Sequence, residues 1–541
     1  MKTNQFMLIT DFKIRNFNKI GKSHCISKTG MVATSHPIAS NAGIAVLNDG
    51  GNALDAALVM SIVLCMAEPQ MTGIGGDCFA LITNDGTTKN LKAINASGYA
   101  GKKYQSSKTL IDKGINEIES NMPHSVTIPG AVSGWEMLHK NYGKKPWKDI
   151  FKIALEYIAD GVLVNERVSL DWSRNEKKLS EDKDSSLIFL KNEKSFKFKE
   201  LFKNEKLIET FKLISEEGSK GFYNGYVAKD LCEKLNSLGG LQTLDDFSNY
   251  NANWVNPIDF CYKGYRIHEC PPNGQGITVF IILSILKNFD LANISKFEYY
   301  HLLCEIIKLS YSLRDEFLSD PDFYNSLNLN WINKKIIRKY IDKIDLKKSS
   351  KFDKSNFPEH SDTIYLTTRD KDGMTVSFIN SLFDAFGSGI TGPKTGILLQ
   401  CRGKSFSLVK NHPNELMGLK RPLHTIIPGM ISRNEKVIGS FGVMGGHYQA
   451  AGHAYLLSNL IDFGFSPQDA LDIPRLFPNN GLIDIEKGFD LDVIDSLKQK
   501  GHKINYPVFP IGGGQIILFD EISKVLIGAS DWRKDGVALG L

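Results

Sequence analysis

The residues with the clearest potential for chemistry lie at the start of a predicted hairpin. Thr363 follows Asp362 directly and opens an alternating strand, and Asp370–Gly373 predicts the turn that ends it. If that turn is a four-residue loop, Thr363 pairs with Asn380, whereas a one-residue bulge places it opposite Ser381. Either register puts a second polar side chain beside the threonine hydroxyl, although an ordinary hairpin with polar ends has the same pattern.

A threonine hydroxyl is a weak nucleophile unless a base stands beside it. A chain that begins with threonine supplies its own base, because its free α-amine has a pKa of about 7.7–8.0 and lies one carbon away. Inside a chain the same nitrogen is an amide and cannot accept a proton. Thr363 could therefore act in this way only after the bond that precedes it has been cut.

The elements that must position this threonine follow from apolar periodicity. Positions 363, 365, 367 and 369 share one face of their strand, because side chains alternate along a strand. Other strands are predicted at 31–34, 78–83, 262–272, 374–381, 436–442, 512–520 and 524–529. Helices are predicted from 53, with Asn52 as the cap, and at 279–287, 299–317, 450–463 and 467–472. This mixture predicts two sheets with helices outside them.

Two glycine-rich segments interrupt these elements. Gly73–Asp77 leads into an apolar strand rather than into a helix start with Lys and Ser or Thr, so a phosphate-binding loop is rejected in favour of a tight turn where backbones pass closely. Gly445 and Gly446 precede a predicted helix and have a plain turn as their simplest interpretation.

Composition excludes several classes of function. The 541 residues are 42% hydrophobic and carry a formal charge of only +5, which gives no support for nucleic-acid binding. The longest apolar run, Ala56–Ala67, is too short to cross a bilayer, and the N-terminus has no signal-peptide core, so a cytoplasmic location without membrane attachment is expected. The eight cysteines form no CxxC pair, so no zinc site is predicted. Residues 1–30 and Lys347–Asn356 are expected to be flexible.

The longer motifs resemble one known family. They are FDAFGSGITGPKTGILLQCR (383–402), RPLHT (421–425) and VMGGH (443–447), together with GGNALDAAL, PQMTGIGGDCFAL, PPNGQG and GASDWRKDG. In this order they resemble the gamma-glutamyltranspeptidase family of N-terminal-nucleophile hydrolases. The resemblance implies an α+β fold, a four-layer αββα sandwich. It also implies self-cleavage into a large chain, 31–362 after the 1–30 extension, and a small chain, 363–541, that form one intertwined domain.

The resemblance also implies roles for individual residues. The cut would fall between Asp362 and Thr363, and Thr363 would then be nucleophile and, through its amine, general base. Ser381 would assist it, and the backbone amides of Gly445 and Gly446 would form the oxyanion hole. No metal ion and no organic cofactor is implied.

Substrate contacts are where the chain departs from the family pattern. Phe383 and Ser405 stand where an asparagine and an aspartate usually meet the glutamyl amine. Arg402 replaces a glutamine, and His424-Thr425 replaces a serine pair. These five residues are the predicted substrate-binding set, and they look more like a subgroup that includes oxamate amidohydrolase, in which Arg402 and His424 would bind a small carboxylate. A surface ion pair for Arg402 and a packed core imidazole for His424 are the alternatives.

Three functional hypotheses remain. The first is an amidohydrolase that cleaves gamma-glutamyl-type or related small amides through a threonine acyl-enzyme, with transfer to water or to an amine. The second is an amidohydrolase for small carboxylate-bearing amides such as oxamate. The third is a catalytically silent scaffold that binds a metabolite, because a fold alone does not fix a function. The expected partners are the small amide substrate and the two chains of one precursor, with a homodimer of processed heterodimers as one compatible assembly.

Overall fold

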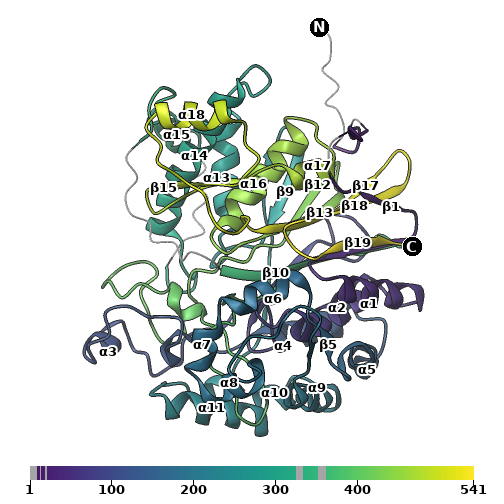
Figure 1. Cartoon of the computed structure of the whole chain (residues 1–541), viewed down its shortest axis with the longest axis vertical. Helices are drawn as coiled ribbons and strands as arrows, with labels where there is room; N and C mark the ends of the chain where they lie inside the picture. Colours follow the sequence, from purple (N-terminus) through teal and green to yellow (C-terminus); the bar gives the residue numbers. More distant parts are fainter. Residues whose placement is uncertain (1–8, 13, 19–20, 325–332, 351–360) are drawn as a thin grey trace.

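The computed structural model describes residues 9–12, 14–18, 21–324, 333–350 and 361–541. Two seven-stranded antiparallel sheets lie face to face, with helices on both outer faces (Figure 1). This arrangement confirms the predicted αββα sandwich. None of the helices in the described ranges is both long and apolar enough to cross a bilayer.

The first sheet carries the predicted nucleophile. Its strands, in spatial order, are β19 (Val537–Gly540), β2 (Gly30–Thr34), β10 (Ser361–Asp370), β11 (Thr375–Asp384), β3 (Asp77–Thr83), β4 (Lys92–Ala96) and β7 (Asn253–Val255). The strand that contains Thr363 is therefore central, paired with β2 on one side and β11 on the other. Within the sheet, β2 lies between β19 and β10, and β11 lies beside β3, so a cut at residue 362 would leave the two chains interleaved.

The second sheet covers the inner face of the first. Its order is β1 (Cys25–Ser27), β18 (Val525–Ser530), β17 (Gly513–Asp520), β13 (Lys436–Met444), β12 (Gly429–Arg433), β9 (Tyr265–Glu269) and β8 (Ile258–Tyr262). Because Cys25–Ser27 pairs with β18, this segment belongs to the folded part rather than to a flexible extension. The predicted strand over 262–272 is in fact the end of β8 and the whole of β9.

Helices of the lower layer in Figure 1 pack on the first sheet. The apolar run predicted to be a buried helix is α2 (Ala53–Ala67), and all fifteen of its residues are buried. Asn52 caps it in a reciprocal bond with Asp55, as predicted. The remaining helices of at least eight residues in this layer are α1 (Pro37–Asn48), α4 (Ala131–Tyr142), α5 (Trp147–Ile158), α6 (Glu166–Ser173), α9 (Glu205–Glu217) and α11 (Tyr226–Ser237). Its shorter helices are α3 (Lys108–Ile111), α7 (Glu176–Ser180), α8 (Lys183–Phe189), α10 (Lys220–Tyr223) and α12 (Leu244–Ser248).

Helices of the upper layer pack on the second sheet. They are α13 (Gly276–Leu286), α14 (Lys296–Phe317), α15 (Lys334–Ile341), α16 (Tyr448–Ile461), α17 (Pro467–Asp472) and α18 (Leu491–Gln499). Small strands complete the fold: β5 (Val162–Leu163), β6 (Leu201–Phe202), β14 (Leu476–Asn479), β15 (Leu482–Ile485) and β16 (Ile504–Asn505). Of the segment predicted to be flexible, 351–356 lies outside the described residues, whereas Ser349 donates its amide to the carbonyl of Lys500 at 2.7 Å.

Candidate active site

Thr363 and Ser381 meet in the β10–β11 hairpin. Their hydroxyl oxygens are 3.0 Å apart, and both residues are fully buried. The hairpin pairs Ile364 with Asn380, and its register shifts between Asp362 and Ile364. The four-residue-loop register, which paired Thr363 with Asn380, is therefore wrong by one residue. The alternative that brings Thr363 to Ser381 describes the contact, but its cause lies at the turn: Arg369 already pairs with Thr375, and this register continues unbroken to Ile364. A separate irregularity follows between Asp362 and Ile364.

Backbone geometry at the end of β11 holds the Ser381 hydroxyl. Phe383 has a φ of +83°, in the left-handed region that residues other than glycine rarely adopt. This turn brings the Phe383 amide to the Ser381 hydroxyl, to which it donates at 2.9 Å. On the opposite side, a Cβ at Gly76 would lie 2.3 Å from the Ser381 carbonyl oxygen, so the glycine-rich turn is a point of close backbone approach, as predicted.

Arg402 extends this pair into the interior. Its Nη2 donates to the Ser381 hydroxyl at 3.3 Å and its Nη1 donates to the Thr425 hydroxyl at 2.8 Å. The guanidinium also lies 4.1 Å from the centre of the Phe383 ring. Arg402 is fully buried, which lowers its pKa to about 10, against the opposing charge of Asp77. It is therefore no surface ion pair, and it contacts the hydroxyl that stands next to Thr363.

His424 is a buried structural side chain in this structure. Its Nε2 lies 3.1 Å from Oδ2 of Asp77, and its Nδ1 accepts a hydrogen bond from the amide of Ile426 at 3.4 Å. This pattern puts the ring proton on Nε2. Burial lowers the pKa of His424 well below its ordinary value, with the Arg402 charge adding to the effect. The packed-imidazole alternative thus describes its surroundings better than direct contact with a substrate does.

Asp77, which the sequence interpretation treated only as the end of a turn, anchors the interior. Its Oδ1 accepts hydrogen bonds from the amides of Gly98 and Gly130 at 3.0 and 3.1 Å and from Gln400 Nε2 at 2.9 Å. We call Asp77, Gln400, Arg402, His424 and Thr425 the buried network. Burial raises the pKa of Asp77 to about 6, although Arg402 and these donors oppose the shift.

Gly445 and Gly446 follow β13 and precede α16. Their φ angles are +114° and +53°, and a Cβ at Gly445 would lie 2.9 Å from the Cα of Gly512, so both positions favour glycine. Within the described part of the chain, neither amide donates a hydrogen bond. Gln275 fixes the turn from behind by donating to the carbonyl of Gly446 at 3.1 Å. Two unpartnered amides in a rigid turn have the character that an oxyanion hole requires.

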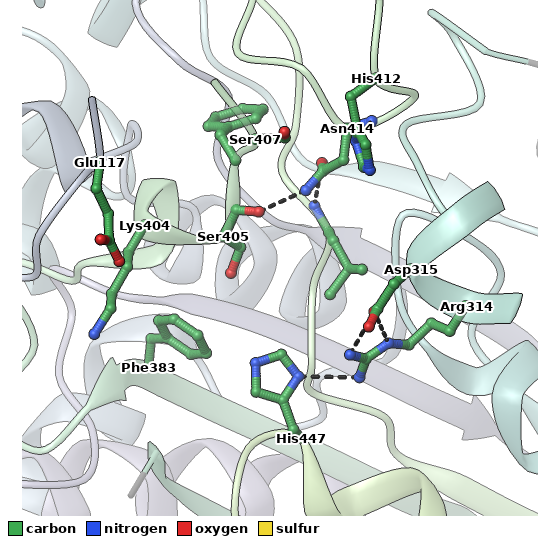
Figure 2. A pocket seen from close by; sticks show the side chains of 12 residues that line it. Glu117, Arg314, Asp315, Phe383, Lys404, Ser405, Ser407, His412, Asn414 and His447 are labelled. Carbon is green, nitrogen blue, oxygen red and sulfur yellow. Dashed lines mark hydrogen bonds and ion pairs between the residues drawn. The ribbon is translucent and has the colours of Figure 1, made fainter. Parts of the chain in front are cut away.

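A cavity of about 230 Å³ opens between the hairpin end and the glycine turn. Of the predicted substrate residues, Phe383 and Ser405 line it, whereas Arg402, His424 and Thr425 belong to the interior behind it. Figure 2 shows the rings of Phe383 and His447 on the same side of this space. The remaining lining residues are Glu117, Arg314, Asp315, Lys404, Phe406, Ser407, His412, Asn414 and Leu423.

Two cations border the cavity, and the sequence interpretation assigned a role to neither. Arg314 lies on α14 and donates to Gln275 Oε1 at 2.8 Å, and its Nη1 is 3.0 Å from Nδ1 of His447. Lys404 Nζ is 3.3 Å from a carboxylate oxygen of Asp384 and keeps 26% of its side chain exposed. Burial, and then the Arg314 charge, lower the pKa of His447 well below its ordinary value, so its ring is neutral.

Fold and site together define an N-terminal-nucleophile type of hydrolase, with a threonine on a central strand between two sheets. The model of the family named Gamma-glutamyltranspeptidase matches residues 39–541, so the chain belongs to this family.

Relatives in this family are named for several different activities. The chain is 34% identical to the glutathione hydrolase-like YwrD proenzyme of Bacillus subtilis, covering 94% of this chain and 98% of the relative. It is 28% identical to the oxamate amidohydrolase proenzyme of Klebsiella pneumoniae, covering 95% and 99%. Among solved structures, cephalosporin acylase from Bacillus halodurans superposes with a TM-score of 0.90 at 33% identity, covering 98% and 99%. These matches do not single out the oxamate subgroup.

Proposed function

We propose that the chain is a precursor that cuts itself between Asp362 and Thr363 and then acts as a threonine amidohydrolase. The observation that carries this proposal is the 3.0 Å contact between the hydroxyls of Thr363 and Ser381 at a bulge in a central strand. The proenzyme relatives support two chains from one precursor.

Processing would begin with attack of the Thr363 oxygen on the carbonyl carbon of Asp362. The peptide C–N bond breaks as an ester forms, and the nitrogen takes up the proton lost by the hydroxyl. Water then hydrolyses the ester, which leaves a carboxylate on Asp362 and a free α-amine on Thr363. Ser381, held by Phe383 and Arg402, would orient the attacking oxygen.

Turnover would repeat the same chemistry on an external amide. The amine of Thr363 accepts the hydroxyl proton as the oxygen attacks, and the amides of Gly445 and Gly446 stabilise the charged oxygen of the tetrahedral intermediate. The amine leaving group departs with a proton, and water or a second amine releases the acyl group.

For the substrate we favour gamma-glutamyl-type or related small amides, in keeping with the name of the glutathione hydrolase-like relative from Bacillus subtilis. Small carboxylate-bearing amides such as oxamate are the second candidate, because Arg314 and Lys404 border the cavity and offer positive charge to a carboxylate. Release of aniline from a gamma-glutamyl anilide, compared with release of ammonia from oxamate, separates the two.

Intact mass of the purified chain beside a Thr363→Ala variant tests the processing step. Dividing 60.4 kDa by length at residue 362 gives expected chains of about 40 and about 20 kDa for the wild type. The variant should remain whole and inactive. A wild type that stays as one chain while the variant has the same fold would favour a silent metabolite-binding scaffold instead.

A further inference from the structure

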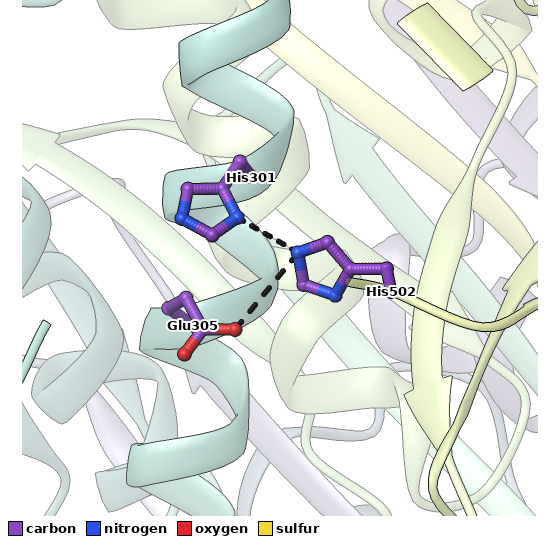
Figure 3. Close-up of side chains that lie close together, drawn as sticks. All are labelled: His301, Glu305 and His502. Carbon is purple, nitrogen blue, oxygen red and sulfur yellow. Dashed lines mark hydrogen bonds and ion pairs between the residues drawn. The ribbon is translucent and has the colours of Figure 1, made fainter. Parts of the chain in front are cut away.

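A second group of chemically capable side chains lies in the upper helical layer, outside the site described above. His301 and Glu305 stand one turn apart on α14, and His502 follows the end of α18. Their nearest ligand atoms all lie within 4.8 Å of one another. Figure 3 shows the side chains of His301 and Glu305 directed from one helix toward the same ring nitrogen of His502. The three residues are 0%, 1% and 5% exposed.

We propose that His301, Glu305 and His502 form a binding site for a divalent transition-metal ion of the Zn²⁺ type. Two imidazoles and one carboxylate are a ligand set that suits Zn²⁺, Co²⁺ or Ni²⁺, whereas Ca²⁺ and Mg²⁺ prefer oxygen ligands alone. Three protein ligands leave a fourth position for water.

The hydrogen bonds around the histidines already select suitable tautomers. His301 Nε2 lies 2.8 Å from the carbonyl oxygen of Asp345, so Nε2 carries the proton and Nδ1 directs its lone pair into the cluster. A bond of this kind from the distal nitrogen is typical of metal-binding histidines.

The geometry requires only a small adjustment. His301 Nδ1 and His502 Nε2 are 2.7 Å apart, a separation at which one proton, on His502, joins them. Metal–nitrogen bonds of about 2.0–2.1 Å at tetrahedral angles would set the nitrogens about 3.3 Å apart. The ion would take the place of that proton, which moves to Nδ1 of His502, an atom with no hydrogen-bond partner in the described part of the chain.

Lys308 is the natural competitor for this ion. Its Nζ donates to Glu305 Oε1 at 2.8 Å and is largely buried, so a positive charge already stands beside the carboxylate. Like charges repel strongly in a buried site, so Lys308 should weaken metal binding. Replacing it with the uncharged, similarly shaped methionine should strengthen binding by about tenfold or more.

The site would join the two chains of the processed protein. His301 and Glu305 precede the expected cut and His502 follows it. Ser350, which precedes the expected cut by twelve residues, also contacts this cluster, because its amide donates a hydrogen bond to Glu305 Oε2 at 3.0 Å. This bridging role rests on the proposed self-cleavage, whereas metal binding itself does not.

Titration of chelator-treated, full-length protein with Co²⁺, followed by the visible absorption of the bound ion, tests the assignment. We expect one ion per wild-type chain, and binding at least about 100-fold weaker in His301→Ala and His502→Gln. His139→Gln, which removes a histidine on α4, is the matched control and should bind like the wild type.

Either of two results would overturn the assignment: no stoichiometric uptake of Co²⁺ or Zn²⁺ by the wild type or by Lys308→Met, or full uptake in both ligand variants. The Thr363→Ala chain separates this outcome from failure of the proposed processing. It should bind the ion like the wild type even though it remains uncut, because all three ligands are present in the precursor.

Discussion

The two sides of the candidate active site differ in how tightly their polar groups are held. In the buried network, Asp77 accepts four hydrogen bonds, and Arg402 is fully buried against two hydroxyls. On the cavity wall, the side chain of Lys404 is a quarter exposed and that of Asp315 is 39% exposed. The buried side is therefore suited to fix the geometry of Thr363, and the wall to choose the substrate.

The largest effect is expected from Asp77→Ala, which removes the acceptor at the centre of the buried network. It leaves the amide of Gly98 and the side-chain amide of Gln400 without their acceptor, and it removes the opposing charge that acts most strongly on Arg402. Breaking a buried charged network by removing one partner costs about 3–5 kcal/mol. We expect a large fall in melting temperature and loss of self-cleavage. Normal melting and cleavage would show that the network does not hold the site.

Arg402→Lys should have the next largest effect. Lysine keeps the charge but cannot reach the hydroxyls of Ser381 and Thr425 with two planar donors at once. Small misplacement of a reacting group can cost about 100-fold in rate, so we expect kcat and the rate of self-cleavage to fall by about 10–100-fold. Steady-state kinetics and a time course of intact mass measure both. A change in KM alone would place Arg402 on the substrate side instead.

Lys404→Gln tests the cavity wall, because it removes the positive charge of Lys404 and keeps a polar side chain there. If Lys404 attracts a substrate carboxylate, KM for such a substrate should rise about tenfold, which corresponds to about 1.4 kcal/mol. Self-cleavage should not change, because Lys404 touches neither Thr363 nor Ser381. The same variant assayed with an uncharged amide serves as the control, and an equal loss on both substrates would contradict a role in carboxylate recognition.

The same contrast explains what the sequence could predict. Thr363, Ser381 and the glycine pair lie within short sequence motifs that can be recognised locally. The alternation of side chains along the hairpin allowed only two pairings of Thr363, with Asn380 or with Ser381. The turn after Arg369 decided between them, because Arg369 pairs with Thr375 rather than with Met374, and the local pattern does not reveal this shift. The wall could not be predicted, because Glu117, Arg314 and Lys404 come from distant segments that only the tertiary fold brings together. Asp77 was missed because two of its four partners are backbone amides, which have no sequence signature, and the other two, Gln400 and His424, lie 323 and 347 residues away along the chain.

The smallest effect is expected from lowering the pH, which protonates His412 on the cavity wall. Partial burial lowers the pKa of His412 below 6.5, although Asp315 opposes the shift. A base with a lowered pKa in the folded state contributes stability above pH 6.5, and this contribution is lost as the pH falls through the folded value.

His412→Gln should therefore change the melting temperature by only about one or two degrees between pH 7.5 and 5.5, relative to the wild type, because a half-exposed group is well screened. The variant should lose less stability in acid than the wild type does. For Asp77 the sign is opposite, because its raised pKa makes stability fall as the pH rises from about 4 to about 6. A His412→Gln variant whose stability falls less steeply than that of the wild type between pH 7.5 and 5.5 would assign this part of the acid response to the wall, because the buried His424 and His447 respond alike in both proteins. Identical profiles for the two proteins would exclude His412 as its source.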